Sequence, residues 1–153
     1  MWGFVWWMVM KLFGLDGLPR VLVDAGETRA LGVEIGKSVK AGAVLALVGD
    51  LGAGKTTLTQ GILEGLDYEG EVTSPTFSLV QEYVGGRLEV FHFDFYRVEE
   101  EGELLNLGWD DYLDRGGVVI VEWPALHEEL LPRETVWLCL EHVDGGRKVR
   151  LRE

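Results

Sequence analysis

The sequence predicts a three-layer α/β fold, in which a mixed sheet with a parallel centre and antiparallel additions lies between two layers of helices. Strand-like and helix-like segments alternate through most of the chain, a pattern typical of parallel strands connected by helices. The segments 43–48 and 118–121 are apolar without interruption, as strands buried on both faces are. Glycine-containing turns at 85–86 and 144–146 favour antiparallel hairpins beside the parallel strands.

The amino-terminal half begins with a short strand expected at 20–23. The residues DAGE at 24–27 then place an acid at a helix N-cap and a glutamate three residues later, a spacing that predicts a helix ending near residue 39. The buried strand at 43–48 follows this helix. After a glycine-rich turn, a second helix is expected over 55–66.

The carboxyl-terminal half is expected to supply the rest of the sheet and one more helix. In chain order, we expect a strand at 77–84, a strand at 88–95, a helix at about 102–113, a strand at 117–123, and a closing hairpin with strands at 135–143 and 147–151. No repeat or linker divides these elements. We therefore interpret residues 21–153 as a single domain.

Composition and charge restrict the class of protein. The chain has 153 residues, of which 47% are hydrophobic, which is enough for one domain with a buried core. The formal net charge is -12, so the surface repels phosphate backbones and direct binding of nucleic acid is not expected. The single cysteine, Cys139, lies in an apolar run and predicts a buried thiol in the reducing cytoplasm.

The first 20 residues are interpreted as an apolar extension outside the domain. They begin with MWGFVWWMVM, which is shorter than the roughly 20 residues of a bilayer span and lacks the basic leading region of a signal peptide. Two interpretations remain open. The segment is either an upstream extension, non-native or disordered, or an apolar patch that docks on a membrane or a partner. The rest of the sequence does not favour a membrane.

The strongest chemical signal is GDLGAGKT at 49–56, which matches G-x-x-x-x-G-K-[ST] between a buried strand and a helix. Glycines let backbone N–H groups surround phosphates, and the positive end of the helix adds to that field. Lys55 supplies a charge to the β- and γ-phosphates, and Thr56 supplies a hydroxyl to Mg²⁺. This motif predicts a P-loop NTPase fold. The residues expected to bind the phosphates are Gly49, Asp50, Leu51, Gly52, Ala53, Gly54, Lys55, Thr56 and Thr57.

The nucleotide is expected to be ATP rather than GTP. A GTPase usually carries N-K-x-D for guanine, and the only asparagine, Asn106, lies in NLGW. Two segments, 67–70 and 114–117, match the D-x-x-G of a GTPase switch, but neither follows the carboxyl end of a buried strand. A small-molecule kinase is an alternative, although no segment resembles the arginine-bearing lid of such kinases.

Two strand ends carry acidic residues that could face the nucleotide. VVIVEWP at 118–124 ends a buried strand with Glu122, a charge that is costly to bury without a positive partner. FHFDFYR at 91–97 alternates phenylalanines with His92 and Asp94, so the phenylalanines are expected in the core. The opposite face is either a solvated edge or the wall of a site, and His92 by itself is more typical of a structural histidine.

A hydroxyl-rich loop follows the predicted P-loop helix. VTSPTFSLV at 72–80 places Thr73, Ser74 and Thr76 around a proline. Switch segments of P-loop proteins supply a second threonine or serine to Mg²⁺ from this part of the fold. An ordinary Ser-Pro turn that leads into a strand explains the pattern equally well.

Four motifs together give the chain a family resemblance. GDLGAGKTT, TSPTFSLVQEY, FHFDFYR and VEWP occur in that order and resemble the bacterial TsaE family, formerly YjeE, from about residue 24 to beyond residue 132. The resemblance implies a Mg²⁺-dependent ATPase of tRNA threonylcarbamoyladenosine biosynthesis. It also implies TsaB and TsaD proteins as partners, with TsaD-like proteins transferring the threonylcarbamoyl group to the adenosine beside the anticodon of ANN-decoding tRNAs. The tRNA is then contacted only indirectly, through the partners.

The resemblance also implies roles for individual residues. Thr56 and Glu122 would hold Mg²⁺, Asp94 would orient or activate the attacking water, and the loop at 73–76 would act as a switch. These roles place Lys55, Asp94 and Glu122 in catalysis.

Three more residues have less settled positions near the nucleotide. Asp24 and Thr28 match a family region near the base or sugar, although helix capping alone explains Asp24. Trp123 is expected either to pack under the site or to lie at the partner surface.

Slow ATP hydrolysis is expected for the protein alone. Phosphoryl transfer needs a group that stabilises charge in the transition state, often an arginine, and Arg97 is the only arginine in a family motif. The alternative from another functional class is a nucleotide-dependent interaction switch, in which the bound nucleotide matters more than its turnover.

Overall fold

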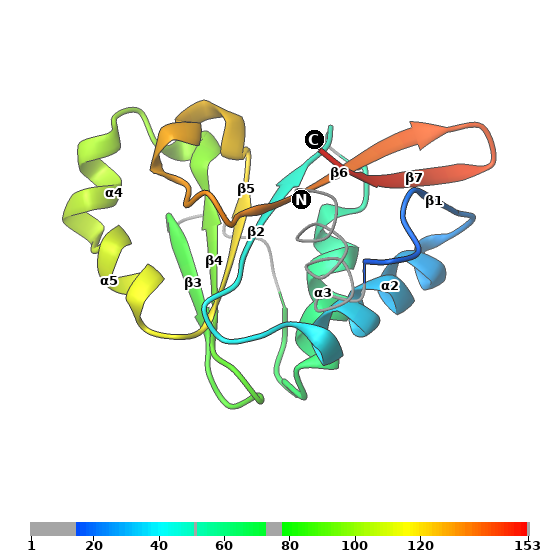
Figure 1. The fold of residues 1–153 in the computed structure, drawn as a ribbon, viewed down its shortest axis with the longest axis horizontal. Helices are drawn as coiled ribbons and strands as arrows, with labels where there is room; N and C mark the ends of the chain where they lie inside the picture. The colour runs from blue at the N-terminus through cyan, green and yellow to red at the C-terminus, as the bar shows by residue number, and fades with distance from the viewer. Residues whose placement is uncertain (1–14, 51, 73–77, 153) are drawn as a thin grey trace, which may run out of the picture.

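The centre of the fold is a sheet whose described strands follow the order β1-β7-β6-β2-β5-β4-β3 (Figure 1). The computed structural model describes residues 15–50, 52–72 and 78–152. The strands are β1 (Arg20–Leu22), β2 (Val44–Val48), β3 (Val80–Tyr83), β4 (Val90–Asp94), β5 (Val118–Glu122), β6 (Val136–Val143) and β7 (Gly146–Leu151). Strands β6, β2, β5 and β4 pair in parallel, and the outer pairs are antiparallel. The predicted parallel centre with antiparallel additions is confirmed.

Helices cover both faces of this sheet. They are α2 (Ala25–Ser38), α3 (Lys55–Gly65), α4 (Glu101–Leu107) and α5 (Trp109–Asp114), with the 3₁₀ helices η1 (Phe95–Arg97) and η2 (Pro124–Leu130). In Figure 1, α2 and α3 lie on one side of the sheet and α4 and α5 on the other. Side-chain alternation produces this division, because Leu45 and Ile120 join the core cluster of α2 and α3, whereas Val44 and Val119 join the second cluster. The three-layer prediction is confirmed.

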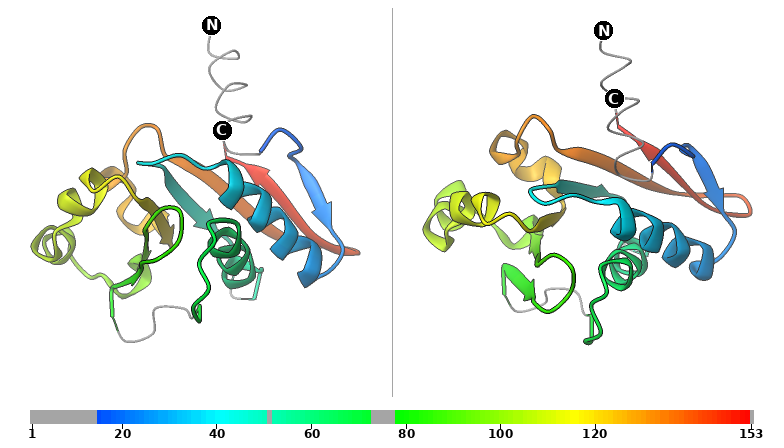
Figure 2. Two further views of the ribbon diagram at one scale, coloured as in Figure 1. Left: turned by 90° about the horizontal axis from the view of Figure 1, so that it is seen from below. Right: turned by 60° about the horizontal axis from the view of Figure 1, so that its bottom comes forward.

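Helices α2 and α3 touch backbone to backbone. Figure 2 shows them packed side by side, and glycines make this approach possible. A Cβ added to Gly61 would collide with the carbonyl oxygen of Arg29, and a Cβ added to Gly32 would collide with that of Leu58. Small residues at such a crossing let the helix axes approach more closely than larger side chains would allow. Helix α2 therefore packs directly against α3, the helix that follows the glycine-rich loop.

The start of α2 follows the predicted capping pattern with one change. Asp24 is the N-cap, and its carboxylate accepts a hydrogen bond from the Glu27 N–H at 2.9 Å. The Glu27 carboxylate reaches back one residue further than in a standard capping box, and accepts the N–H of Val23 at 2.7 Å. Both bonds satisfy donors at the start of the helix, where intrahelical acceptors are missing.

Besides the later start of β3 at Val80 and the unpredicted helix η2, two elements differ from the prediction. The expected single helix at 102–113 is two helices, because Gly108 has a φ of 102°, a left-handed conformation that ends a helix. The strand expected to reach Phe95 ends at Asp94, whose side chain accepts the N–H of Tyr96 and begins η1. Phe95 packs in the core as predicted, whereas Tyr96 is exposed and belongs to η1 and not to the strand.

The residues before β1 contact the domain. Leu15 is fully buried in the core cluster of α2 and α3, and Leu18 packs against that cluster. Residues 1–14 lie outside the described residues, so the interpretation of the Trp-rich start stays a prediction. Among the helices of the described ranges, none has the length and apolar character needed to cross a membrane.

Candidate functional site

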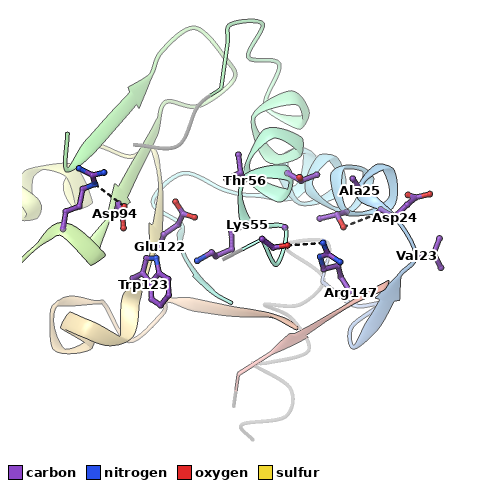
Figure 3. Close-up of a pocket in the computed structure, with 14 residues that line it drawn as sticks. Val23, Asp24, Ala25, Lys55, Thr56, Asp94, Glu122, Trp123 and Arg147 are labelled. Atoms are coloured by element: carbon purple, nitrogen blue, oxygen red, sulfur yellow. Dashed lines mark hydrogen bonds and ion pairs between the residues drawn. The ribbon is translucent and has the colours of Figure 1, made fainter. Parts of the chain in front are cut away.

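A cavity of about 490 Å³ opens where β2, β4 and β5 end, next to the start of α3 (Figure 3). This volume lies within the usual range for sites that bind small molecules. Its position is also typical, because open α/β sheets bind ligands outside the carboxyl ends of their parallel strands. The lining residues are Val23, Asp24, Ala25, Thr28, Gly52, Gly54, Lys55, Thr56, Thr57, Asp94, Arg97, Glu122, Trp123 and Arg147.

The glycine-rich loop between β2 and α3 forms one wall of the cavity. The Ala53 N–H donates to the carbonyl oxygen of Asp50 at 3.0 Å, which closes a tight turn. Gly52 and Gly54 have φ values of 80° and 105°, a left-handed backbone that side chains disfavour. Gly54 is the N-cap of α3, so the helix begins with its positive end at the cavity, where it favours an anion.

Glu122 reaches the cavity from the last position of β5. In the parallel ladders, it is the direct partner of Leu47 on β2 and of Asp94 on β4. It is only 7% exposed, and His92 lies 3.0 Å away, from Nε2 to Oε2. Burial alone would raise the pKa of Glu122, but the hydrogen bond with His92 and the charges of His92 and Lys55 outweigh burial and lower it. The carboxylate therefore remains ionised.

Asp94 is the second acid of the cavity, and its environment raises its pKa, whereas that of Glu122 is lowered. Burial and the negative charge of Glu122 raise the pKa of Asp94, against the opposing effects of the Tyr96 N–H, Arg97 and His92. The Arg97 Nε lies 3.9 Å from Asp94 Oδ2. Asp94 therefore accepts a proton more readily than an ordinary aspartate, which suits a group that orients or deprotonates water.

Lys55 lies against an aromatic ring in this structure. Its Nζ is 4.4 Å from the ring centroid of Trp123, within the range of a cation–π interaction. Trp123 has a φ of 55°, an uncommon left-handed conformation for a residue other than glycine, and it lines the cavity. Tyr96 also packs against Trp123, with their ring centroids 5.2 Å apart. In Figure 3, Lys55 points toward Glu122 and Trp123.

The start of α2 forms the opposite wall. Thr28 is 2% exposed, and its hydroxyl donates to the carbonyl oxygen of Asp24 at 3.3 Å. The Asp24 side chain caps the helix. Both residues line the cavity, where the sequence analysis expected them. Asp24 also has the structural role that the capping pattern predicted.

Arg147 is a lining residue that the sequence analysis missed. It belongs to β7, and its Nη2 donates to the carbonyl oxygen of Gly52 at 3.1 Å. Strand β7 pairs with β6, which lies beside β2, so sheet order carries Arg147 to the glycine-rich loop. No local motif surrounds Arg147, and only strand order and register across the sheet could have identified it.

The structure brings together most of the predicted site residues that it describes. Gly49, Asp50 and Ala53 belong to the loop but do not line the cavity. Leu51, Thr73, Ser74 and Thr76 lie outside the described residues, so the switch assignment stays a prediction. The predicted residues that line the cavity are Asp24, Thr28, Gly52, Gly54, Lys55, Thr56, Thr57, Asp94, Glu122 and Trp123.

The donor atoms at the cavity fit a hard divalent cation. Thr56 offers a hydroxyl, while Glu122 and Asp94 offer carboxylates, and oxygen donors of this kind are those that Mg²⁺ prefers. The ionised state of Glu122 adds the negative charge that such a cation requires. These residues therefore fit Mg²⁺.

A second group of possible metal ligands lies outside the cavity. Glu101, His127 and Glu129 place one ligand atom each within 4.8 Å of the others. The His127 Nε2 already hydrogen-bonds with the Val98 carbonyl oxygen at 3.1 Å, and Glu129 is solvent-exposed. We assign this group no role.

Comparisons with known proteins agree with this geometry. A sequence model of the family described as "Threonylcarbamoyl adenosine biosynthesis protein TsaE" matches residues 22–149. The tRNA threonylcarbamoyladenosine biosynthesis protein TsaE of Bacillus subtilis is 45% identical over 128 residues, which are 83% of this chain and 80% of that protein. The protein of the same name from Treponema pallidum is 35% identical over 127 residues, covering 82% of this chain and 93% of that one.

A solved structure also resembles the fold. The crystal structure of Bacillus subtilis YdiB superposes with a TM-score of 0.73 at 38% sequence identity, covering 88% of this chain and 83% of that one. The predicted P-loop NTPase fold is confirmed.

Proposed function

This chain belongs to the TsaE family of threonylcarbamoyl adenosine biosynthesis proteins, and on that premise we propose that it is a Mg²⁺-dependent ATPase. In this proposal it acts with TsaB and TsaD proteins to form the threonylcarbamoyl group on the adenosine next to the anticodon of ANN-decoding tRNAs. One observation carries the proposal. Glu122 and Asp94 are direct partners in the ladder between β5 and β4, and both line the same cavity as Lys55, the first residue after the glycine-rich loop.

The residues of the cavity have distinct roles in this proposal. Backbone N–H groups of the glycine-rich loop and the Lys55 ammonium bind the phosphates of ATP. Thr56 and Glu122 would hold Mg²⁺, and the bound ion would supply positive charge that offsets the charge of the phosphates. Asp94 orients the attacking water and accepts its proton. The water oxygen bonds to the γ-phosphorus, the bond from that phosphorus to the β–γ bridging oxygen breaks, and ADP and phosphate leave.

The arginines of the cavity support slow hydrolysis by the protein alone. Among the described residues, Arg97 and Arg147 line the cavity. Arg97 lies 3.9 Å from Asp94, and Arg147 donates to Gly52, so each guanidinium already contacts an oxygen of the protein. A group that stabilises the transition state is then expected from the partners or from a rearrangement that they cause.

The charge of the chain supports indirect contact with tRNA. A net charge of -12 disfavours binding to a phosphate backbone, so the tRNA is held by the partner proteins in the cytoplasm. Tight binding of tRNA by this protein alone at physiological salt would contradict this part of the proposal.

A nucleotide-dependent switch is the second candidate. The observation that favours it is the contact of Lys55 with Trp123, which packs against the exposed Tyr96. A phosphate that draws Lys55 away would change a surface that a partner could recognise. In this candidate the bound nucleotide matters and its hydrolysis does not.

Reconstitution separates the two candidates. TsaB, TsaD, tRNA, an activated donor of the threonylcarbamoyl group and ATP are combined with the unaltered protein, with Asp94→Asn or without the protein. Both modified tRNA and free phosphate are measured. The ATPase proposal expects partners to change phosphate release and expects Asp94→Asn to bind ATP without supporting repeated modification. Full modification by a variant that binds ATP without hydrolysis would favour the switch, and equal phosphate release with and without partners would count against the ATPase proposal.

A further inference from the structure

His92 is a buried polar side chain whose role the proposed reaction leaves open. It is 1% exposed and lies in the middle of β4, flanked in register by Ile120 on β5 and Gln81 on β3. Its Nε2 lies 3.0 Å from Glu122 Oε2. Its Nδ1 is buried and has no hydrogen-bond partner in the ranges 15–50, 52–72 and 78–152. Among the described residues, the hydrogen-bond partner of the His92 ring is therefore Glu122.

The chemistry of the pair fixes the direction of the hydrogen bond. An ionised carboxylate only accepts, so His92 Nε2 carries the hydrogen whether the ring is neutral or charged. Oε2 of Glu122 is thus engaged from within the sheet, and Oε1 is the oxygen left for another partner. Glutamate has one methylene more than the aspartate usual at this position of P-loop proteins, and the contact with His92 restrains that longer side chain.

We propose that His92 is a positioning residue that holds Glu122 by Oε2 and directs Oε1 to the cation. This arrangement favours ions that bind one carboxylate oxygen. This inference rests on the proposed function, in which Glu122 holds Mg²⁺. Mg²⁺ demands near-ideal octahedral geometry, whereas Ca²⁺ accepts bidentate carboxylates in a flexible shell. A hydrogen bond that occupies one lone pair of Oε2 therefore disfavours the bidentate mode that Ca²⁺ uses relative to the single-oxygen mode that suits Mg²⁺ and the similar ion Mn²⁺.

The test compares Mn²⁺ with Ca²⁺ on the complex of the protein with ATP. Mn²⁺ binding is measured by electron paramagnetic resonance, and Ca²⁺ binding by displacement of Mn²⁺. The variants are His92→Leu, which removes the donor, His92→Gln, which keeps an N–H donor near the position of Nε2, and Glu122→Gln. ATP binding in EDTA is the control for the nucleotide site, because His92 is not among the described residues that line the cavity.

We expect His92→Leu to weaken Mn²⁺ binding by about tenfold or more, the usual effect of losing a partner of a metal ligand. Ca²⁺ binding should fall less, ATP binding in EDTA should stay the same, and His92→Gln should restore most of the preference for Mn²⁺. In the Glu122→Gln background, His92→Leu should have no further effect, because the two residues act through one contact.

Several results would overturn the inference, and they are distinct from failure of the proposed function. An unchanged ratio of Mn²⁺ to Ca²⁺ affinity in His92→Leu, or additive losses in the double variant, would reduce His92 to a core residue. If His92→Leu does not fold, loss of the preference in a folded His92→Gln variant overturns the inference and its retention supports it. Mn²⁺ binding that is unaffected by Glu122→Gln would instead remove Glu122 as a ligand and with it the proposed metal site.

Discussion

Asp94 and Glu122 are direct partners in the parallel ladder between β4 and β5, so two carboxylates end neighbouring strands on the same side of the sheet. Their surroundings shift the pKa values of the two carboxyl groups in opposite directions. Burial and repulsion raise the pKa of Asp94, whereas contacts with His92 and Lys55 lower that of Glu122. Two acids with opposite shifts in one cavity are typical of a division between proton transfer and charge binding.

Replacing Asp94 should make the protein more stable at neutral pH. A carboxyl whose pKa is raised by folding stabilises the native state only while protonated, so its contribution is present below the unfolded pKa and lost as pH rises through the folded value. Asp94→Asn removes the charge and keeps an acceptor for the Tyr96 N–H. We expect a higher melting temperature at pH 7, measured by circular dichroism in EDTA, and no gain at acid pH. The exposed Asp110 is the control, since Asp110→Asn should give no gain at pH 7.

The helix crossing predicts a large difference between two glycine substitutions. Gly61→Ala places a methyl group against the Arg29 carbonyl of α2 and should cost about 2 kcal/mol or more in the free energy of unfolding by urea, because the helices must separate. Gly102 lies in α4 with open space around it, so Gly102→Ala should be neutral or stabilise by up to about 1 kcal/mol. Similar losses for both variants would contradict the close crossing.

Arg147 should support ATP binding from outside the sequence motif. Arg147→Ala removes the hydrogen bond to the Gly52 carbonyl and should weaken ATP binding by about tenfold, since hydrogen bonds of charged groups contribute about 1.5–3 kcal/mol. Calorimetric titration with ATP measures the effect. Arg150 is the matched control on the same strand, because its Nε bonds to Glu141 Oε1 at 2.8 Å, and Arg150→Ala should leave ATP affinity unchanged.

The contact between Lys55 and Trp123 should make the indole a reporter of phosphate binding. If phosphate withdraws the ammonium from the ring, addition of ATP should change tryptophan fluorescence, and Trp123→Phe should abolish that change. Trp137 is the control, because Arg152 lies 3.5 Å from its ring centroid in a similar contact, away from the cavity. A signal that persists in Trp123→Phe and disappears in Trp137→Phe would contradict this prediction, because the fluorescence change would then come from Trp137 and not from the ring that Lys55 contacts.

Local pattern was sufficient for the elements that form the centre of the site. Unbroken apolarity identified β2 and β5, the glycine motif identified the start of α3, and the parallel centre then placed Glu122 at the edge where the motif begins. Pattern could not give the break at Gly108, because an isolated glycine inside a helical pattern is often tolerated. It also could not pair His92 with Glu122 or bring Arg147 to Gly52, because both contacts depend on the register of strands distant in sequence.

The position of β7 between β1 and β6 has a consequence for the order in which the protein matures on the ribosome. Among the described strands, β1 pairs with β7 alone, and Arg147 comes from β7 as well. All other described residues that line the cavity precede β7 in the chain. The part of the cavity wall that Arg147 forms is therefore completed only after the other described lining residues have been synthesised.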